Sequence, residues 1–368
     1  MRIEGIQLHN FRNFENLELS FDSSRNVLIG ENAQGKTNLI EAIYFCGFAR
    51  SFRTQNSTDL IRIGEQRGSV SLDLVSEDIS KNITIILDQN GKKMIKKDGK
   101  IIRRTADLLN NLVVMVFSPE DLRIIKDSPE KRRNFINKEL SQIRPRYYEC
   151  VRLYRDALQQ KNYMLRDDQR QGNLNEEMLD IYDMQLAKYG GEIVKYRKNF
   201  IQLLSQRANE VQQSITGGKE ELQIKYNHSM SVEHPYEDLL AHRDRDIYSG
   251  HSGVGPQRDD LEFYINGRNA RKYGSQGQQR TVALALKLAE IRIARDVIGE
   301  NPVLLLDDVL SELDEERQTY LFRQIEDVQL FITTTDSHSG MLEKMMKGKV
   351  YTIQSGTVIE NAEKTLKN

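Results

Sequence analysis

The stretch from Asn26 to Phe48 constrains the fold of this chain more than any other. A short apolar run at residues 27–29 predicts a strand, and apolar residues at helical spacing near the end of the stretch predict a helix. The turn between them fits the pattern G-x-x-x-x-G-K-[ST], with its defining residues at Gly30, Gly35, Lys36 and Thr37. A strand, this turn and a helix in immediate succession indicate a phosphate-binding loop within an α/β fold.

The residues of this loop predict a defined chemistry. Its glycines let the backbone fold around a phosphate, so that successive N–H groups and the positive end of the helix face one anion. Lys36 is expected to reach the β- and γ-phosphates, and Thr37 to ligate Mg²⁺. An ordinary glycine-rich turn is the alternative interpretation. The predicted nucleotide-binding residues are Gly30, Glu31, Asn32, Ala33, Gln34, Gly35, Lys36, Thr37 and Asn38.

Composition narrows the class of protein. The chain has 368 residues, of which 38% are hydrophobic, so it is long enough for two or three packed lobes and is not of a disordered type. Its first residues lack a secretion signal, no apolar stretch is long enough to cross a membrane, and Cys46 and Cys150 are its only cysteines. We therefore expect a cytoplasmic protein. A net charge of −1 leaves the partner open, because a local patch can be basic on a neutral protein.

Alternating apolar residues predict antiparallel strands in the first third of the chain. Residues 2–21 indicate a hairpin, and residues 69–75 and 82–88 indicate two further strands. A third hairpin is expected at residues 92–104, and it can be either an edge strand protected by lysines or an arm that contacts DNA phosphates. The cations of this most basic stretch are Lys92, Lys93, Lys96, Lys97, Lys100, Arg103 and Arg104.

The middle of the chain is predicted to be helical. Residues 112–117 indicate a buried strand, and Ser118–Asp121 resemble a helix start. Residues 129–213 have helical spacing with a polar break near residues 170–175, which predicts an inserted lobe of long antiparallel helices. The tyrosines of this lobe can either pack at helix seams or stack on bases. They are Tyr147, Tyr148, Tyr154, Tyr163, Tyr182, Tyr189 and Tyr196.

Beyond the lobe the elements become shorter. Residues 222–226 predict a strand, residues 232–243 a short helix, and residues 261–267 a hairpin. Ser275 is then expected to be the N-cap of a helix with a broad apolar face. The histidines of this region lack metal-ligand spacing and are interpreted as surface or hydrogen-bonded residues. They are His228, His234 and His242.

Two apolar runs near the C-terminal end predict parallel strands that finish in polar residues. The run at residues 303–306 ends in Asp307 and Asp308, and the run at residues 330–332 leads to Asp336. Ligands collect at the carboxyl ends of strands in an open α/β sheet, so Asp307 and Asp336 are expected to converge on the lysine of the phosphate loop. In phosphate-loop enzymes one acid of such a pair holds Mg²⁺, and its neighbour orients or deprotonates the attacking water.

The order of these motifs resembles the ABC-type ATPase head. The loop, a serine-glycine-glutamine helix start, the acidic strand and a Ser-x-Leu-Asp segment follow one another as in that superfamily. The opening Asn10-Phe11-Arg12 and the long insertion resemble its SMC-related branch, and within that branch the chain is similar to the RecF family of bacterial recombination mediators. The segments that carry this similarity are Gly30–Leu39, Ser51–Thr54, Phe117–Leu122, Gly255–Asp260 and Leu305–Asp308.

The resemblance implies an α/β fold, with an ABC-type ATPase head that has a mixed sheet, a small antiparallel β subdomain and an inserted α-helical lobe. The N-terminal part of the ATPase lobe is expected over residues 1–128 and the helical lobe over residues 129–245. The C-terminal part, with the signature motif, the acidic strand and the D-loop, is expected over residues 246–368.

The resemblance also implies a nucleotide site shared by two copies of the chain. ATP and Mg²⁺ are the expected cofactors, with Thr37 and Asp307 as metal ligands and with Lys36 and Asp308 as catalytic residues. The signature serine contacts the γ-phosphate held by the opposite subunit in this superfamily, so ATP is expected to drive a head-to-tail homodimer. Further nucleotide contacts are expected from Arg12, Ser275, Gly277, Gln278, Asp314 and Asp336.

Two departures from the superfamily pattern affect the expected chemistry. No Q-loop glutamine follows residues 112–117, and Asp336 stands in the region where transporters have a switch histidine, which leaves the γ-phosphate sensor open. Asp308 stands where transporters usually have glutamate, and its shorter side chain reaches less far toward the attacking water. Slow ATP hydrolysis is therefore expected, and the resemblance implies that DNA stimulates it.

The function implied by the resemblance is ATP-dependent, sequence-nonspecific binding to single- and double-stranded DNA during recombinational repair and replication restart. Gapped or junction DNA is the expected substrate, and RecR and RecO the expected partners in loading RecA. An SMC-like ATPase of another pathway is the alternative. A transporter ATPase would need a Q-loop, a nuclease would need a further acidic domain, and a chromosome tether would need long heptad repeats.

Overall fold

The computed structural model describes residues 1–335 and 348–360, and its contacts divide the chain into two units. The first, here called the sheet unit, comprises residues 1–122 and 290–368. The second, here called the helical unit, comprises residues 123–289. The predicted α/β class with an inserted helical lobe is confirmed.

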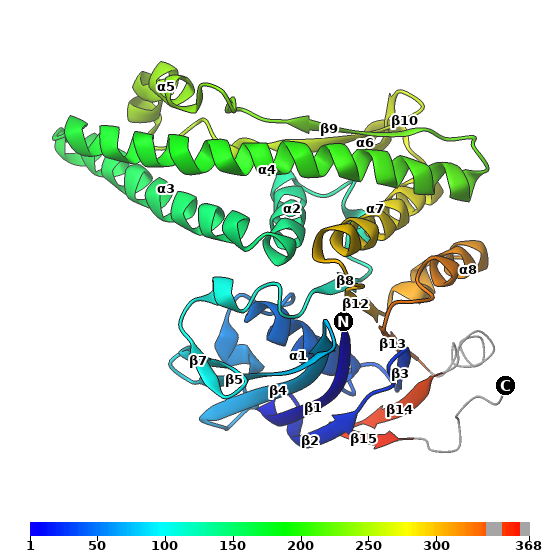
Figure 1. Cartoon of the computed structure of the whole chain (residues 1–368). Coiled ribbons are helices and arrows are strands. Elements are labelled where there is room, and N and C mark those ends of the chain that lie inside the picture. The colour runs from blue at the N-terminus through cyan, green and yellow to red at the C-terminus, as the bar shows by residue number, and fades with distance from the viewer. Residues whose placement is uncertain (336–347, 361–368) are drawn as a thin grey trace. The chain divides into compact units, whose positions relative to one another are not determined.

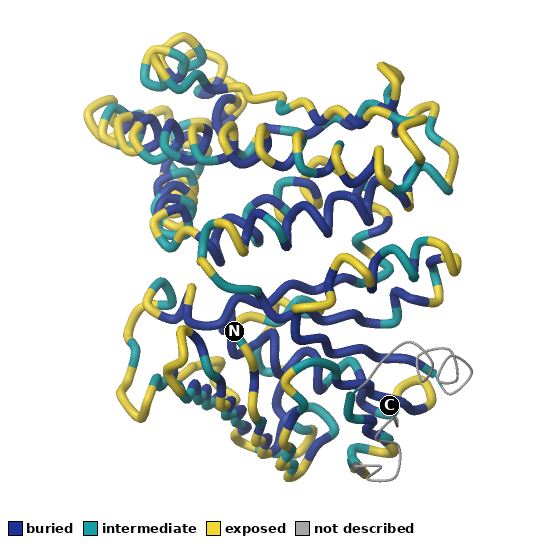
Figure 2. The backbone as a smooth tube through the Cα atoms, turned by 45° about the vertical axis from the view of Figure 1, so that its right-hand side comes forward, coloured by how far each residue is buried: buried dark blue, intermediate teal, exposed yellow. Residues whose placement is uncertain are grey.

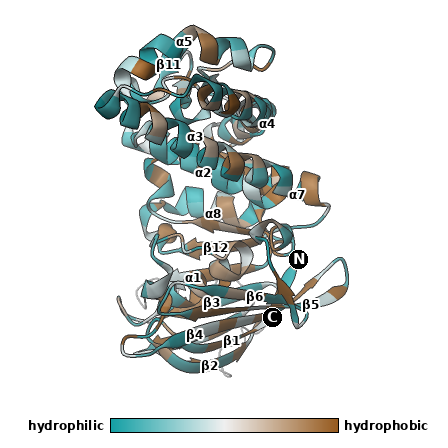
Figure 3. Cartoon of the chain, turned by 90° about the vertical axis from the view of Figure 1, so that its left-hand side faces the viewer, coloured by the Kyte–Doolittle hydropathy of each residue, from teal (hydrophilic) through white to brown (hydrophobic). Residues whose placement is uncertain are grey.

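A mixed six-stranded sheet positions the phosphate loop in the sheet unit (Figure 1). Its strand order is β15-β14-β3-β13-β12-β8, in which all neighbours are parallel except β14 and β15. Each inner strand contains an apolar run, such as residues 303–306 of β12, which is brown in Figure 3, because both faces of a parallel sheet are covered. The strands are β3 (Arg25–Ile29), β8 (Val114–Phe117), β12 (Val303–Asp307), β13 (Leu330–Thr334), β14 (Lys349–Gln354) and β15 (Thr357–Glu360).

A second six-stranded sheet is antiparallel, with the order β2-β1-β4-β5-β6-β7. Buried and exposed residues alternate along its strands (Figure 2), which is the pattern that predicted its three hairpins. The basic β6–β7 hairpin lies at one edge of this sheet. The strands are β1 (Arg2–Phe11), β2 (Phe14–Ser20), β4 (Arg67–Ser76), β5 (Ile79–Asp88), β6 (Lys93–Lys97) and β7 (Lys100–Ile102).

Helix α1 (Lys36–Phe48) follows the phosphate loop and is buried on nearly all sides, since it contacts strands of both sheets. Helix α8 (Glu315–Gln324) follows the acidic strand and is amphipathic. Short 3₁₀ turns complete this unit. They are η1 (Ser57–Leu60), η2 (Thr105–Asp107) and η5 (Val309–Glu312).

Long helices lie side by side in the helical unit, as the adjacent α3 and α4 show in Figure 1. Their predicted break is confirmed: α3 ends at a left-handed glycine, and Asn175 caps α4 by accepting from the backbone N–H of Met178. The helices are α2 (Pro129–Ile143), α3 (Pro145–Gln171), α4 (Glu176–Thr216), α5 (Pro235–Ser249), α6 (Ala270–Tyr273) and α7 (Gln276–Ile298). A small antiparallel sheet of β9 (Leu222–Asn227), β10 (Asp260–Ile265) and β11 (Arg268–Asn269) completes the unit.

Two predicted helix boundaries were wrong. The segment Ser118–Asp121 leads only into the 3₁₀ turn η3 (Asp121–Arg123), because the Asp121 carboxylate accepts from the backbone N–H of Ser118 and closes a local turn. The next α-helix begins at Pro129, after the N-cap Ser128. Helix α5 begins later than predicted, at Pro235, which has no N–H to leave unpaired in a first turn.

The two units divide the chain differently from the predicted domains. Residues 246–289 belong to the helical unit, not to the ATPase part. Strand β10 pairs with β9, and Asp260 forms an ion pair with Arg132 of α2, so this segment is held by helical-unit residues. The signature serine, Ser275, therefore lies in the helical unit, and α7 runs from one unit into the other.

Among the described residues, no helix combines the length and the apolar character that crossing a membrane requires. Both cysteines are buried as free thiols.

Candidate nucleotide site

The phosphate loop joins the end of β3 to the start of α1, as predicted. Its glycines meet two separate requirements of the backbone. A Cβ at Gly30 would collide with the carbonyl oxygen of Ile353 on the adjacent strand β14. Gly35 is the N-cap of α1 and has a φ of 119°, a conformation that other residues rarely adopt. The loop is thus shaped both by its own turn and by the neighbouring strand.

Lys36 lies folded along the loop. Its side chain is buried, and Nζ donates to the carbonyl oxygens of Gly30 at 2.6 Å and Glu31 at 3.3 Å. A lysine held in this way carries a positive charge at the centre of a turn whose N–H groups also bind anions. The geometry fits the contact with terminal phosphates that the sequence predicts.

A polar network joins the loop to the acidic strand. Thr37 Oγ1 donates to Asp307 Oδ1 at 2.9 Å, although the two residues are far apart in the sequence. Thr333, opposite Asp307 on β13, also donates to Asp307 Oδ1, at 2.9 Å. Burial raises the pKa of Asp307, while the hydrogen bonds from Thr333 and Thr37 offset part of that rise. The structure therefore brings both predicted metal ligands together at the carboxyl ends of the strands.

Asp308 follows at the end of β12. It has a left-handed backbone with a φ of 51°, and its N–H donates to Thr333 Oγ1 at 2.8 Å. Its Oδ1 lies 3.3 Å from the same Thr333 hydroxyl that contacts Asp307, and the residue is partly exposed. Asp308 thus lies beside the predicted metal ligands with access to water.

Two turns support the loop at Gln34. The backbone carbonyl oxygen of Gln34 accepts from Asn13 Nδ2 at 2.9 Å and from the N–H of Gly356 at 3.2 Å. The side-chain oxygen of Gln34 accepts from the N–H of Ser355 at 2.6 Å. Asn38 also donates to Asn13, at 2.8 Å. The β1–β2 turn and the β14–β15 turn together hold the loop in place.

Sequence reasoning missed a buried carboxylate on α1. Glu41 is fully buried and accepts two bonds from the Arg12 guanidinium, each of 2.8 Å, and a further bond from the Ser51 hydroxyl. Arg53 lies 3.5 Å from the same carboxylate and donates to Asn38 at 2.8 Å. The signal was available, because a glutamate between Ile40 and Ala42 on a buried helix requires a charged partner.

Asp314 and Asp336 were also predicted to contact the nucleotide. Asp314 caps α8, accepts from the backbone N–H of Arg317 and forms an ion pair with its side chain. Asp336 lies outside the described residues. No described group of three or more His, Cys, Asp or Glu residues has the arrangement of a metal site. Thr37 and Asp307 supply oxygen ligands of the kind that Mg²⁺ takes alongside phosphate and water.

The signature residues form a capping box at the start of α7, within the helical unit. Ser275 Oγ accepts from the N–H of Gln278 at 3.2 Å, and Gln278 Oε1 accepts from the N–H of Ser275 at 2.9 Å. The carbonyl oxygen of Gly277 accepts from Thr281 Oγ1 at 3.0 Å. The predicted N-cap is confirmed.

Comparison with known proteins identifies the family. The model of the RecF/RecN/SMC N terminal domain matches residues 2–359. A DNA replication and repair protein RecF of Clostridium perfringens is 44% identical over 340 residues, which cover 91% of this chain and 93% of that protein. The chain belongs to the RecF family. A RecF of Clostridium acetobutylicum is 40% identical over 98% of this chain and all of that protein.

Solved RecF structures have the same fold. The structure of the recombination mediator protein RecF-ATP in the RecFOR pathway has a TM-score of 0.90 and 34% identity, with 98% of each chain covered. An SMC head bound to the C-terminal winged-helix domain of ScpA has a TM-score of 0.58 at 15% identity, which shows the fold alone. The predicted membership of the RecF family and the SMC-like head fold are confirmed.

One of the motifs that indicated the RecF family lies in the helical unit and is partly buried. In the segment Gly255–Asp260, Asp259 forms an ion pair of 2.8 Å with Arg197 and accepts from the Tyr226 hydroxyl. Asp260 accepts two bonds from Arg132. Both carboxylates therefore have partners within the unit and hold this segment in place, whereas Arg258 of the same motif is exposed.

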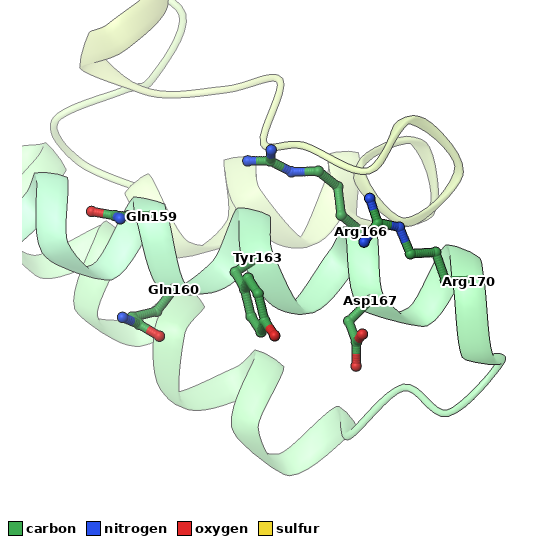
Figure 4. A pocket seen from close by; sticks show the side chains of 6 residues that line it. All are labelled: Gln159, Gln160, Tyr163, Arg166, Asp167 and Arg170. Carbon is green, nitrogen blue, oxygen red and sulfur yellow. The ribbon is translucent and has the colours of Figure 1, made fainter.

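The tyrosines of the RecF-family insertion divide between the two interpretations. Tyr147 and Tyr154 are buried and hydrogen-bonded, as the packing interpretation predicts. Tyr163 is 69% exposed and lies in a shallow hollow along α3 (Figure 4). The hollow contains no residue predicted to bind the nucleotide. Its lining residues are Gln159, Gln160, Tyr163, Arg166, Asp167 and Arg170.

The basic β6–β7 hairpin uses some of its cations internally. Lys93 donates to the carbonyl oxygen of Ala49 at 2.8 Å, and burial lowers its pKa. Lys97 donates to Asn111. Lys92 and Lys100 are exposed. This distribution is compatible both with edge protection and with contact to an anionic partner.

Proposed function

We propose that this chain is an ATP-dependent DNA-binding protein of recombinational repair, and that ATP binding drives its dimerisation on DNA. The observation that carries the proposal is the 2.9 Å bond between Thr37 and Asp307, which joins the phosphate loop to the acidic strand. Membership of the RecF family and the similarity to a RecF-ATP structure support ATP as the nucleotide.

The roles in the proposed site follow from its geometry. The loop backbone and Lys36 bind the phosphates, and Thr37 and Asp307 hold Mg²⁺, which supplies positive charge to the terminal phosphates. Asp308 orients the attacking water and accepts its proton. The side chain of Asp308 reaches less far toward the attacking water than a glutamate would, so turnover is slow. Hydrolysis, stimulated by DNA, acts as the release step.

The chain carries one phosphate loop and one signature serine, so the proposed site is completed by a second copy. Each ATP is held by Lys36 of one subunit and is contacted by Ser275 of the other, at the N-terminus of a helix. The dimer closes on DNA, preferentially at gaps or junctions, and acts with RecR and RecO to promote RecA loading. Family membership supports this assignment.

The shared site is tested with Ser275→Arg. The variant is expected to bind ATP as a monomer with unchanged affinity, because the loop residues are untouched. ATP-dependent dimerisation is expected to disappear, since a bulky cation replaces the serine at the contact with the partner's nucleotide. Light scattering with and without ATP measures whether the protein is a monomer or a dimer. A dimer that still forms with ATP would rule out the shared site.

Binding to DNA is tested by a salt titration with ATP present. Contacts to phosphates release counterions, so the logarithm of the affinity should fall linearly with the logarithm of the salt concentration. Random-sequence duplexes should bind equally at each salt concentration. An affinity that does not depend on salt would contradict a DNA clamp held by phosphate contacts.

A further inference from the structure

Glu220 lies in the turn between α4 and β9, and its carboxylate joins two glutamines. Oε1 accepts from Nε2 of Gln278 at 2.9 Å, and Oε2 accepts from Nε2 of Gln212 at 2.7 Å. Gln212 is fully buried near the end of α4, whereas Gln278 stands in the first turn of α7. Glu220 thereby connects the end of the longest helix of the unit to the signature motif.

The bond from Glu220 determines how the Gln278 amide is oriented. Oε1 of Gln278 already accepts from the N–H of Ser275, and Nε2 donates to Glu220. If the amide turned over, Nε2 would face the N–H of Ser275 and Oε1 would face the carboxylate, so that both bonds would be lost. With the carboxylate in place, only one orientation satisfies both neighbours.

This orientation controls the signature serine. The capping box holds the Ser275 backbone through Gln278 Oε1 and uses Ser275 Oγ as the acceptor for the Gln278 N–H. The Ser275 hydroxyl hydrogen then remains available for donation to a phosphate oxygen. A loosened Gln278 side chain would release the Ser275 backbone and broaden the range of positions that its hydroxyl occupies.

We propose that Glu220 is a positioning residue for Ser275, which it holds through Gln278 in the orientation required to contact the γ-phosphate of a second copy. This inference rests on the proposed function of Ser275 in the shared site. A carboxylate suits the role because its two oxygens accept from Gln278 and Gln212 at the same time. Glu220 acts through Gln278 and does not touch the nucleotide.

The first test compares three single variants. Glu220→Ala removes the acceptor and is expected to weaken ATP-dependent dimerisation about tenfold for each of the two shared sites, or about 100-fold in all. The affinity of the monomer for ATP should stay unchanged. Glu221→Ala, which removes an exposed carboxylate one residue along the chain, is the matched control and should dimerise normally.

Glu220→Gln separates positioning from net charge. The introduced amide keeps an oxygen that can accept from Gln278, and its N–H can donate to Gln212 if the Gln212 amide turns over. That rotation is available because Gln212 Oε1 has no hydrogen-bond partner. Glu220→Gln should therefore recover most of the dimerisation that Glu220→Ala loses. If both variants lose it equally, the charge is what matters and the positioning role is overturned.

A pairing experiment distinguishes positioning from a general loss of structure. Fluorescence transfer is measured between differently labelled chains in the presence of ATP. A pair of Lys36→Met and Glu220→Ala chains retains one shared site with an intact loop and an intact signature. A wild-type chain paired with a Lys36→Met/Glu220→Ala chain retains none. The first pair should show stronger transfer than the second, and equal transfer would overturn the inference.

The outcomes separate this inference from the proposed function. If Ser275→Arg still dimerises with ATP, the shared site itself fails. If Ser275→Arg abolishes the dimer but Glu220→Ala forms it with wild-type affinity, only the role of Glu220 fails.

Discussion

The predicted nucleotide site of the sheet unit and the interior of the helical unit both bury charged side chains, but with different kinds of partner. In the sheet unit, Lys36 and Asp307 lie at the carboxyl ends of parallel strands, and their partners are loop carbonyls and hydroxyl groups. In the helical unit, Arg197 and Lys161 are paired with buried aspartates inside the packing of the helices. The first arrangement leaves Lys36 and Asp307 without an ion pair between them, as the proposed nucleotide site requires, whereas the second neutralises charge within the fold.

The helical pairs explain why that unit can contain long and largely polar helices. Lys161 of α3 lies 2.8 Å from Asp183 of α4 and 2.7 Å from Asp246 of α5, so one ammonium group joins three helices. Buried pairs of this kind add little net stability, but removal of one partner leaves an uncompensated charge. Substitution should therefore affect folding in the helical unit and ligand binding in the sheet unit.

The largest effect is expected for Arg197→Met in the helical unit. The guanidinium contacts Asp259, Tyr147 and Asn137, and its loss leaves the Asp259 carboxylate buried without its cation. The free energy of unfolding of this unit should fall by about 3–5 kcal/mol. Denaturant titration followed by far-UV circular dichroism measures it.

The matched control for Arg197→Met is Lys198→Met, at the next position of the same helix, where the side chain is exposed. It should leave the stability unchanged to within about 0.5 kcal/mol. Equal losses in the two variants would show that the buried pairs are not what distinguishes the helical unit.

The next effect is expected for Lys36→Met in the sheet unit. Affinity for ATP should fall by about 100-fold, which corresponds to about 2.7 kcal/mol, because the substitution removes the cation proposed to contact the terminal phosphates. The melting temperature without ATP should change little. Calorimetric titration and thermal unfolding measure the two quantities.

Lys92→Met makes the same substitution at an exposed position of the sheet unit and serves as the control for Lys36→Met. It should preserve ATP affinity. A large fall in melting temperature for Lys36→Met would mean that this lysine is structural, as Arg197 is, and the contrast between the units would be lost.

The smallest effect concerns pH and Asp307. Burial raises the pKa of Asp307, so its ionised form in the folded protein costs stability at neutral pH. Asp307→Asn should therefore raise the free energy of unfolding at neutral pH, by no more than about 2 kcal/mol. The gain should shrink as pH falls through the raised pKa and vanish below 3.8, where the carboxyl is protonated in both the folded and the unfolded state.

Asp78→Asn, at an exposed turn, is the control for the pH experiment and should show no such gain. Denaturant titrations at several pH values give the comparison. A stability gain for Asp307→Asn that stays constant as pH falls would show that ionisation of Asp307 is not its cause.

Local patterns made much of the fold predictable from the sequence. The phosphate loop, the hairpins and the helical insertion each depend on residues close together in the chain, where periodicity and turn chemistry act directly. Asp307 was placed beside the loop correctly because parallel strands share one carboxyl edge. Arg12 was assigned to the nucleotide from family resemblance, whereas the structure shows its guanidinium bound to Glu41.

What the sequence did not predict depends on pairs that are distant in the chain. The end of the inserted lobe was set at residue 245, but Asp259 and Asp260 hold the following segment in the helical unit through Arg197 and Arg132. The hydrogen bond between Glu220 and Gln278 likewise joins two residues that are distant in the chain. The local periodicity of apolar residues does not indicate such distant partners, so only the folded structure reveals them.

The support of the phosphate loop by the β14–β15 turn has a consequence for synthesis of the protein. The backbone of Gln34 is held by the N–H of Gly356, and Gly30 packs against Ile353 of β14. The loop is translated among the first residues, but its supports emerge from the ribosome among the last. A nascent chain therefore contains the loop sequence long before the loop can adopt its final conformation. The chain should acquire affinity for nucleotide only when the β14–β15 hairpin has been released.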